Sequence, residues 1–171
     1  MIRRHRLVSA ALAAGAAAAL TVVAAAPSYA DRPGPRMPGD HSDLPLTFDA
    51  GVVCPFQVTI SLEVAHDWSR EESPGVLRGS GRLVLRFTND DTETSVVRNV
   101  SGPGSFSFDA VGNLTAIDVS GVSLGWQTEG SDLTGTIGTA LYVSHGPFHY
   151  NGDLQLVSYS GTYESICNVL E

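Results

Sequence analysis

Histidines next to a carboxylate or a glycine are the first residues of this sequence that could do chemistry. His66 precedes Asp67, and a histidine paired with a carboxylate can act as a general base. Adjacent residues of an extended strand point to opposite faces, so this pair is not expected to interact. His145 and His149 flank Gly146-Pro147, where straight strand would hold them about 13 Å apart, too far to share a metal ion. A bulge there would shorten the distance, but no third ligand lies nearby, and we predict no catalytic residue and no metal site.

Acidic turns offer a second kind of chemistry, the binding of Ca²⁺. Asp90-Asp91-x-Glu93 and Gly130-Ser131-Asp132 carry oxygen ligands. The first lacks the alternating ligands and central glycine of a dedicated calcium loop, and polar turns between strands explain both segments better. The chain contains no Lys, which excludes Schiff-base chemistry. We predict no cofactor.

The first thirty residues have the composition of an export signal. Arg3, Arg4 and Arg6 precede an apolar run from Leu7 to Ala26, and Ser28-Tyr29-Ala30 places small residues where a signal peptidase reads them. The run is about long enough to span a bilayer, but it consists mainly of weakly hydrophobic alanine. The sequence therefore predicts a signal peptide over 1–30, cleavage after Ala30, and a secreted mature chain without stable membrane insertion.

Charge and cysteine content describe that mature chain. Loss of residues 1–30 leaves seven Arg against eighteen Asp and Glu, a formal net charge of −11. Such a surface repels phosphate backbones, so nucleic acid is not a predicted partner. The two cysteines, Cys54 and Cys167, indicate a disulfide in an exported protein. In the chain-entropy model a loop of this length contributes on the order of 4–5 kcal/mol to stability.

Alternation of apolar and polar residues predicts an all-β domain over 46–171, preceded by a disordered Pro-rich leader over 31–45. The alternation is clearest over 56–64, 77–87, 105–109 and 122–127, and Asn151-Gly152 is the strongest hairpin signal. Short turns favour a single antiparallel meander of about eight strands. We predict a closed or nearly closed β-barrel, with a β-sandwich as the alternative, because glycines inside strands allow strong coiling. The disulfide would join its first and last strands.

Several local patterns resemble a family of small secreted actinobacterial proteins whose activity is not established. The patterns are Cys54-Pro55-Phe56-Gln57-Val58, Phe87-Thr88-Asn89, Asn99-Val100-Ser101-Gly102-Pro103-Gly104 and the terminal Ser165-Ile166-Cys167. The resemblance covers roughly residues 50–168. It implies secretion, the disulfide and the β fold, and it implies no mechanism.

The architecture suggests a non-enzymatic protein that binds a small apolar molecule inside the barrel, because a barrel of about eight strands is just wide enough for one small ligand. The candidate lining residues are Phe106, Phe108, Trp126, Leu85 and Phe87. One alternative is an interaction protein or inhibitor that acts through an exposed loop. Another is a small barrel cyclase or isomerase using Glu63 or Asp109, although alternation places both side chains outside.

Overall fold

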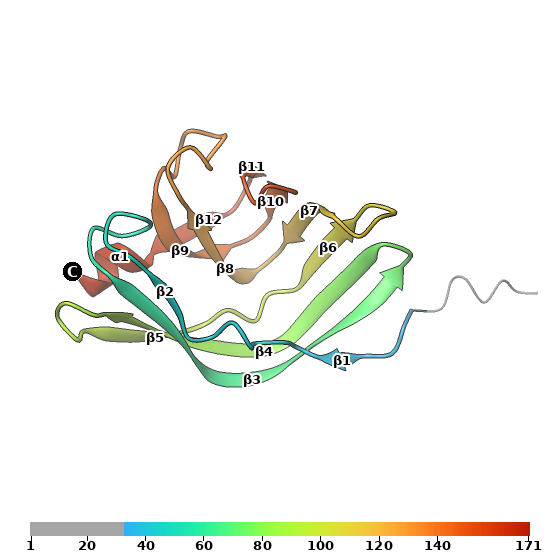
Figure 1. Cartoon of the computed structure of the whole chain (residues 1–171), viewed down its shortest axis with the longest axis horizontal. Coiled ribbons are helices and arrows are strands. Elements are labelled where there is room, and N and C mark those ends of the chain that lie inside the picture. The colour runs from blue at the N-terminus through green and yellow to red at the C-terminus, as the bar shows by residue number, and fades with distance from the viewer. Residues whose placement is uncertain (1–32) are drawn as a thin grey trace, which may run out of the picture.

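The computed structural model describes residues 33–171, which form an all-β domain ending in one short helix (Figure 1). The predicted signal peptide and its cleavage after Ala30 lie outside the described residues. The strands are β1 (Met37–Pro38), β2 (Leu46–Phe48), β3 (Val58–Ser73), β4 (Val76–Asn89), β5 (Ser95–Asn99), β6 (Gly104–Phe108), β7 (Leu114–Val119), β8 (Val122–Gln127), β9 (Ala140–His145), β10 (Phe148–Asn151), β11 (Leu156–Tyr159) and β12 (Thr162–Ser165), and the helix is α1 (Ile166–Leu170).

The strands pair in two antiparallel sheets. The larger follows the order β1-β3-β4-β6-β7-β10-β11, with β2 attached to β3 and β5 attached to β4, and the smaller has the order β12-β9-β8. The predicted all-β antiparallel fold is therefore confirmed, with twelve strands in place of about eight. Among residues 33–171 no strand pairing closes the sheets into a ring.

Three chain segments pass from one sheet to the other. β7 continues into β8, β9 into β10, and β11 into β12, so that 114–127 and 140–151 form one long bent hairpin. The two arms of this hairpin stay paired on both sides of the bend: β7 pairs with β10 in the larger sheet, and β8 pairs with β9 in the smaller sheet.

Gly121, Gly146 and Gly161 lie at these three bends, and Gly102 lies beside Gly121; we call the four residues the glycine corner. The Gly102 amide donates to the Val122 carbonyl at 2.5 Å, and the Gly146 amide donates to the Gly121 carbonyl at 2.8 Å. A Cβ atom added to Gly161 would lie 2.1 Å from the carbonyl oxygen of His145. An added Cβ would collide with backbone atoms at Gly102, Gly146 and Gly161, whereas Gly121 has space for one but a positive φ of 83° that favours glycine.

β9 is the central strand, because both of its faces are buried. Leu141 and Val143 face the main core, between the smaller sheet and the β2–β5 half of the larger one. Ala140 and Tyr142 face a second core formed with β7, β10 and β11. The main core consists of Val53, Cys54, Phe56, Val58, Ile60, Leu85, Phe87, Val100, Leu141, Val143, Ile166, Cys167 and Leu170.

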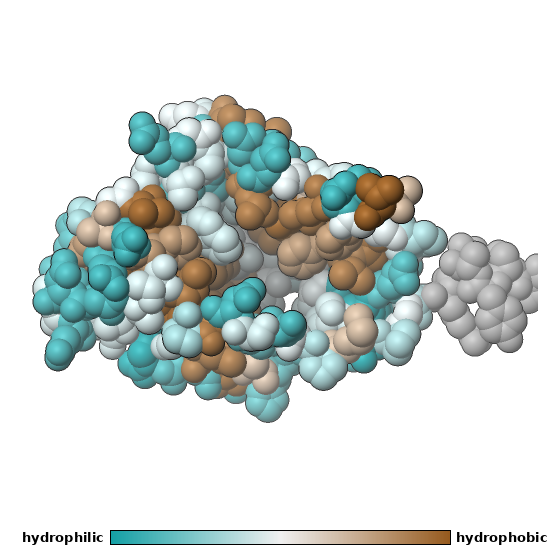
Figure 2. Space-filling model, in the orientation of Figure 1, coloured by the Kyte–Doolittle hydropathy of each residue, from teal (hydrophilic) through white to brown (hydrophobic). Residues whose placement is uncertain are grey.

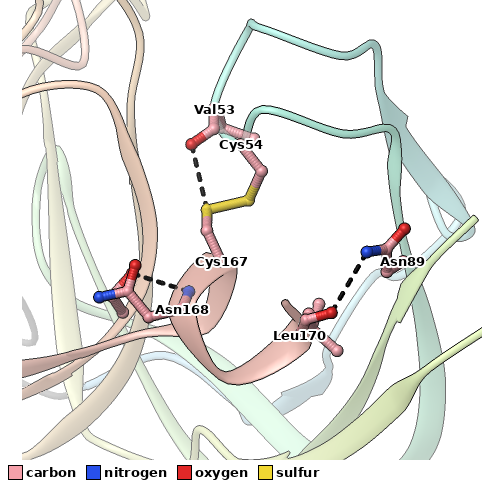
Figure 3. The surroundings of a disulfide bond; sticks show 7 residues. Val53, Cys54, Asn89, Cys167, Asn168 and Leu170 are labelled. Atoms are coloured by element: carbon pink, nitrogen blue, oxygen red, sulfur yellow. Dashed lines mark hydrogen bonds between the residues drawn. A yellow bond between two sulfur atoms is a disulfide. The ribbon is translucent and has the colours of Figure 1, made fainter. Parts of the chain in front are cut away.

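The disulfide between Cys54 and Cys167 is confirmed, with Cα atoms 5.4 Å apart (Figure 3). It joins the loop after β2 to helix α1, where the sequence had placed it between two strands. The helix is too short for a helical pattern to be visible in the sequence, and the Ser165 hydroxyl caps it by accepting from the Asn168 amide at 3.3 Å. Beside it, the Asn89 side chain donates to the Leu170 carbonyl at 3.2 Å. The chain's last residues are thereby fixed to β4 as well as to Cys54.

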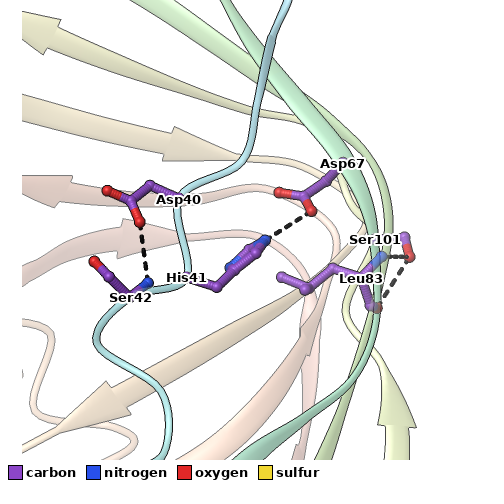
Figure 4. A network of polar contacts seen from close by, with 6 residues as sticks. All are labelled: Asp40, His41, Ser42, Asp67, Leu83 and Ser101. Carbon is purple, nitrogen blue, oxygen red and sulfur yellow. Dashed lines mark hydrogen bonds and ion pairs between the residues drawn. The ribbon is translucent and has the colours of Figure 1, made fainter.

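The segment 33–45 is part of the fold, unlike the disordered leader expected over 31–45. Met37 pairs with Ser69 and Pro38 with Trp68, and His41 Nε2 lies 2.8 Å from Asp67 Oδ1 (Figure 4). Arg36 lies over the Trp68 ring, 4.1 Å from its centroid. This segment has few apolar residues, so backbone pairing and side-chain polar contacts hold it along β3, and a composition argument cannot detect them.

Candidate functional site

An apolar pocket of about 250 Å³ opens where the two sheets diverge. β5 pairs with β4 in the larger sheet, and β8 pairs only with β9 in the smaller sheet. β8 is therefore an edge strand of the smaller sheet. The pocket lies along this edge, and Figure 2 shows a hollow on this face with apolar residues in its wall. Its lining residues are Phe106, Ile117, Val119, Ser123, Leu124, Gly125, Trp126, Tyr150 and Leu154.

The candidate lining residues from the sequence divide between pocket and core. Phe106 and Trp126 line the apolar pocket. Leu85 and Phe87 are 2% and 0% exposed and belong to the main core. Phe108 is half-buried at the end of β6, outside the pocket lining. Alternation finds the buried face of a strand, but it does not distinguish packed interior from open pocket.

A chain of hydrogen bonds runs inward from the pocket. The hydroxyls of Tyr150 and Tyr142 lie 2.9 Å apart, Gln127 Nε2 donates to the Tyr142 hydroxyl at 3.3 Å, and Ser131 Oγ donates to Gln127 Oε1 at 2.8 Å. Burial raises the pKa of Tyr142 and of Tyr150, so both remain neutral phenols. No sequence pattern indicates this series of hydrogen bonds, since its members come from β8, β9, β10 and a loop.

Gly125 makes room for the Tyr142 ring. The two residues are directly opposite on β8 and β9, and a Cβ added to Gly125 would lie 2.5 Å from the ring and 2.8 Å from its hydroxyl. The phenol therefore lies against the Gly125 backbone, which itself lines the pocket. The Tyr142 hydroxyl is therefore buried directly behind a backbone segment that lines the pocket.

A second, polar groove of about 480 Å³ lies beside the glycine corner. Five residues on five adjacent strands are in register across it, in the order Arg78, Ser105, Asp118, His149 and Ser158. His149 Nδ1 lies 2.7 Å from Asp118 Oδ1, which leaves Nε2 free to act as a base. Sequence spacing could not reveal this row, because strand pairing alone brings its members together.

The row resembles a Ser-His-Asp arrangement in residue type but not in contacts. Within 33–171 no hydrogen bond joins Ser158 to His149, and the His149 and Asp118 side chains are 40% and 56% exposed. A nucleophile needs a hydrogen bond to its base, and exposure weakens the Asp–His interaction. We therefore assign the row to surface polar contacts.

The other residues considered for chemistry have structural partners. Asp67 contacts His41, which lies far from it in sequence, and makes no recorded contact with His66. Glu63 pairs with Arg86 at 2.5 Å. Asp109 accepts from the Asn113 side chain and from backbone amides of its own turn, and these bonds lower its pKa, which opposes the protonated form that a general acid needs. Over residues 33–171 no three metal-ligating side chains gather.

One motif was absent from the predictions. Residues 121–125 read Gly-Val-Ser-Leu-Gly, the Gly-x-Ser-x-Gly pattern of α/β-hydrolases. That pattern requires a sharp turn between a strand and a helix, whereas Ser123 lies inside β8 and its carbonyl accepts from the Ser144 hydroxyl at 3.2 Å. The match carries no hydrolase function here.

Asp132 organises the loop between β8 and β9. Burial opposes its ionisation, but hydrogen bonds from the Thr134 hydroxyl and from the Gly138, Ile137 and Thr134 amides outweigh burial and lower its pKa to about 2. These bonds fix the loop that also supplies Ser131 to the polar chain.

Asp132→Asn is expected to lower the free energy of unfolding by roughly 1–2 kcal/mol at pH 7. A carboxylate whose pKa is depressed on folding stabilises the fold fully above its unfolded pKa, near 4. It loses this contribution as the pH falls through the folded value of about 2. Urea unfolding of both proteins from pH 7 to pH 2 should therefore show a difference that shrinks with acid. A difference that stays constant over this range would contradict the assignment.

Fold and pocket together define an all-β, disulfide-bonded protein with an apolar pocket at the edge of a split sheet. No known family model, curated protein or solved structure matches the chain. No helix within 33–171 is long and apolar enough to cross a membrane.

Proposed function

We propose that this chain is a secreted protein that binds a small apolar molecule in the pocket along the edge of β8. The observation that carries the proposal is the pocket itself. Most of its lining is aliphatic or aromatic, and its polar side-chain groups are the Tyr150 phenol, the Ser123 hydroxyl and the Trp126 indole N–H, which is the composition typical of small-molecule sites. Its volume of about 250 Å³ exceeds the ~150 Å³ of an apolar cavity that accepts benzene, so a bicyclic ligand fits.

Export is part of the same proposal. The disulfide favours an oxidising compartment, and the basic and apolar pattern of residues 1–30 is that of a cleaved signal. The resemblance to small secreted actinobacterial proteins points the same way. We favour a binding protein over a cyclase or isomerase because Glu63 and Asp109, the candidate acids, form structural contacts away from the pocket. A loop-mediated interaction protein has no specific observation in its favour.

Leu154→Asp is expected to weaken ligand binding about tenfold or more while leaving the fold intact. Leu154 lines the pocket, is 44% exposed and has φ of 61°, a conformation that Asp adopts more easily than Leu. The change removes an apolar contact and adds a charge at the pocket, where an apolar ligand gains nothing from it. The Trp68→Phe background leaves Trp126 as the sole tryptophan, and its emission can be followed while tetralin, a bicyclic hydrocarbon, is added.

Leu133→Asp is the matched control, since Leu133 is 56% exposed and does not line the pocket. Tetralin should bind this control as tightly as the unchanged protein. Absence of saturable binding to the unchanged protein would overturn the proposed function. Equal weakening by the two aspartates would show that tetralin binds elsewhere.

A further inference from the structure

We infer that the natural ligand of the apolar pocket carries a hydrogen-bond-accepting oxygen, as in a ketone, ester or ether, which accepts from the Tyr150 hydroxyl. The inference rests on the proposed function and adds the chemical class of the ligand. It comes from the direction of the hydrogen bonds between Tyr150, Tyr142, Gln127 and Ser131.

The series of hydrogen bonds begins at Ser131, in the loop between β8 and β9. Ser131 Oγ lies 2.8 Å from Gln127 Oε1 and 3.0 Å from the Thr128 carbonyl oxygen, the two acceptors within reach of its one hydrogen. The Gln127 amide nitrogen donates to the Tyr142 hydroxyl at 3.3 Å. The Tyr142 oxygen therefore already accepts one hydrogen bond before Tyr150 is considered. The two tyrosines share a single further bond, 2.9 Å long, and possess two hydroxyl hydrogens.

One of the two hydroxyl hydrogens therefore has no acceptor within the pair, and the burial of the two residues indicates which tyrosine carries it. Were Tyr150 the donor, the spare hydrogen would belong to Tyr142, which is 0% exposed and does not line the pocket. A donor enclosed in the core without an acceptor is costly. When Tyr142 donates to Tyr150, the spare hydrogen lies on Tyr150, which lines the pocket and is 7% exposed.

The position of the hydroxyl pair supports this choice. The Tyr142 hydroxyl lies against Gly125, and both Gly125 and Tyr150 line the pocket. The spare Tyr150 hydrogen thus belongs to a residue that lines the pocket. Ser123 and Trp126 are the other lining residues with a side-chain donor, and the rest of the lining is apolar or glycine. A ligand without an accepting oxygen leaves this donor unpaired once water is displaced. The pocket therefore favours an oxygenated ligand over the matching hydrocarbon.

The experiment compares two bicyclic ligands of similar shape, tetralin and 1-tetralone, which differ by one carbonyl oxygen. Both are titrated into the full secreted chain and into Tyr150→Phe, with binding followed by the Trp126 indole resonance. The ratio of the two dissociation constants is the readout, because the different water solubilities of the ligands cancel when the ratios are compared between proteins. Loss of one hydrogen bond should reduce the preference for 1-tetralone roughly two- to tenfold in Tyr150→Phe.

Tyr159→Phe is the control, since Tyr159 lines the polar groove and not the apolar pocket; its ratio should equal that of the unchanged protein. If both ligands bind and the ratio is the same in Tyr150→Phe, the inference is wrong while the proposed function stands. If neither ligand binds the unchanged protein, both are wrong. Tyr150→Phe keeps the ring, and tetralin binding to it verifies that the pocket is intact.

Discussion

Replacement of both Cys54 and Cys167 by alanine is expected to lower the free energy of unfolding by about 4–5 kcal/mol. The disulfide spans 113 residues, so it removes a large part of the conformational freedom of the unfolded chain. Both half-cystines are also buried in the main core, 3% and 6% exposed, beside Val53, whose carbonyl oxygen lies 3.2 Å from the Cys167 sulfur. A loss of this size approaches the total stability of a small domain.

Equilibrium unfolding in urea, followed by tryptophan emission, measures this effect. The unchanged protein treated with a reductant is the control, because it loses the cross-link and keeps the side chains. It should unfold close to the midpoint of the alanine variant. A double variant within about 1 kcal/mol of the oxidised protein would show that the loop between the cysteines is already restricted when unfolded.

The second large effect is expected at the glycine corner, where Gly161→Ala should cost about 3 kcal/mol. The added methyl group would lie 2.1 Å from the His145 carbonyl oxygen and 3.0 Å from the Gly146 Cα. Both neighbours are backbone atoms, so relief requires β9 and β12 to separate at the bend. The four glycines are in contact with one another or with neighbouring strands, and the displacement would spread along the corner.

Gly130→Ala separates this steric effect from the loss of glycine's conformational freedom. Gly130 has φ of 76° but no atom within 4 Å of an added Cβ. Its replacement should cost only the strain of a left-handed residue, about 1 kcal/mol. Urea midpoints of the two variants test the ranking. A Gly161→Ala variant as stable as Gly130→Ala would mean that the corner tolerates wider strand spacing.

Much of the fold could be predicted because its determinants are local. Val58 and Ile60 alternate with Thr59 and Ser61, and the structure buries the first pair completely. The cysteine count and the predicted compartment indicated the disulfide before any geometry was known. The Pro-rich segment 33–45 shows the limit of this reasoning. Its order depends on β3 as a partner, as in the His41–Asp67 contact, and composition does not report partners.

The candidate site could be predicted only in part. Phe106 and Trp126 were selected as inward-facing aromatics and do line the pocket, whereas Leu85 and Phe87 face inward into packed core. Tyr150 was not among the candidate lining residues, and nothing in the sequence ties it to Tyr142 or Gln127. Each of these side chains is unremarkable alone, and its chemistry comes from neighbours on other strands.

The sequence by itself determined the strand-forming segments, their inward faces and the covalent link, because alternation and cysteine chemistry act through neighbours in sequence or through residue type. Only the tertiary structure decided where the strands bend, that β8 becomes an edge strand of the smaller sheet, and that a pocket opens between β8 and the strands β6, β7 and β10. Those features depend on how closely backbones distant in sequence approach one another. Four glycines permit that approach, and their effect exists only once the strands carrying them lie side by side.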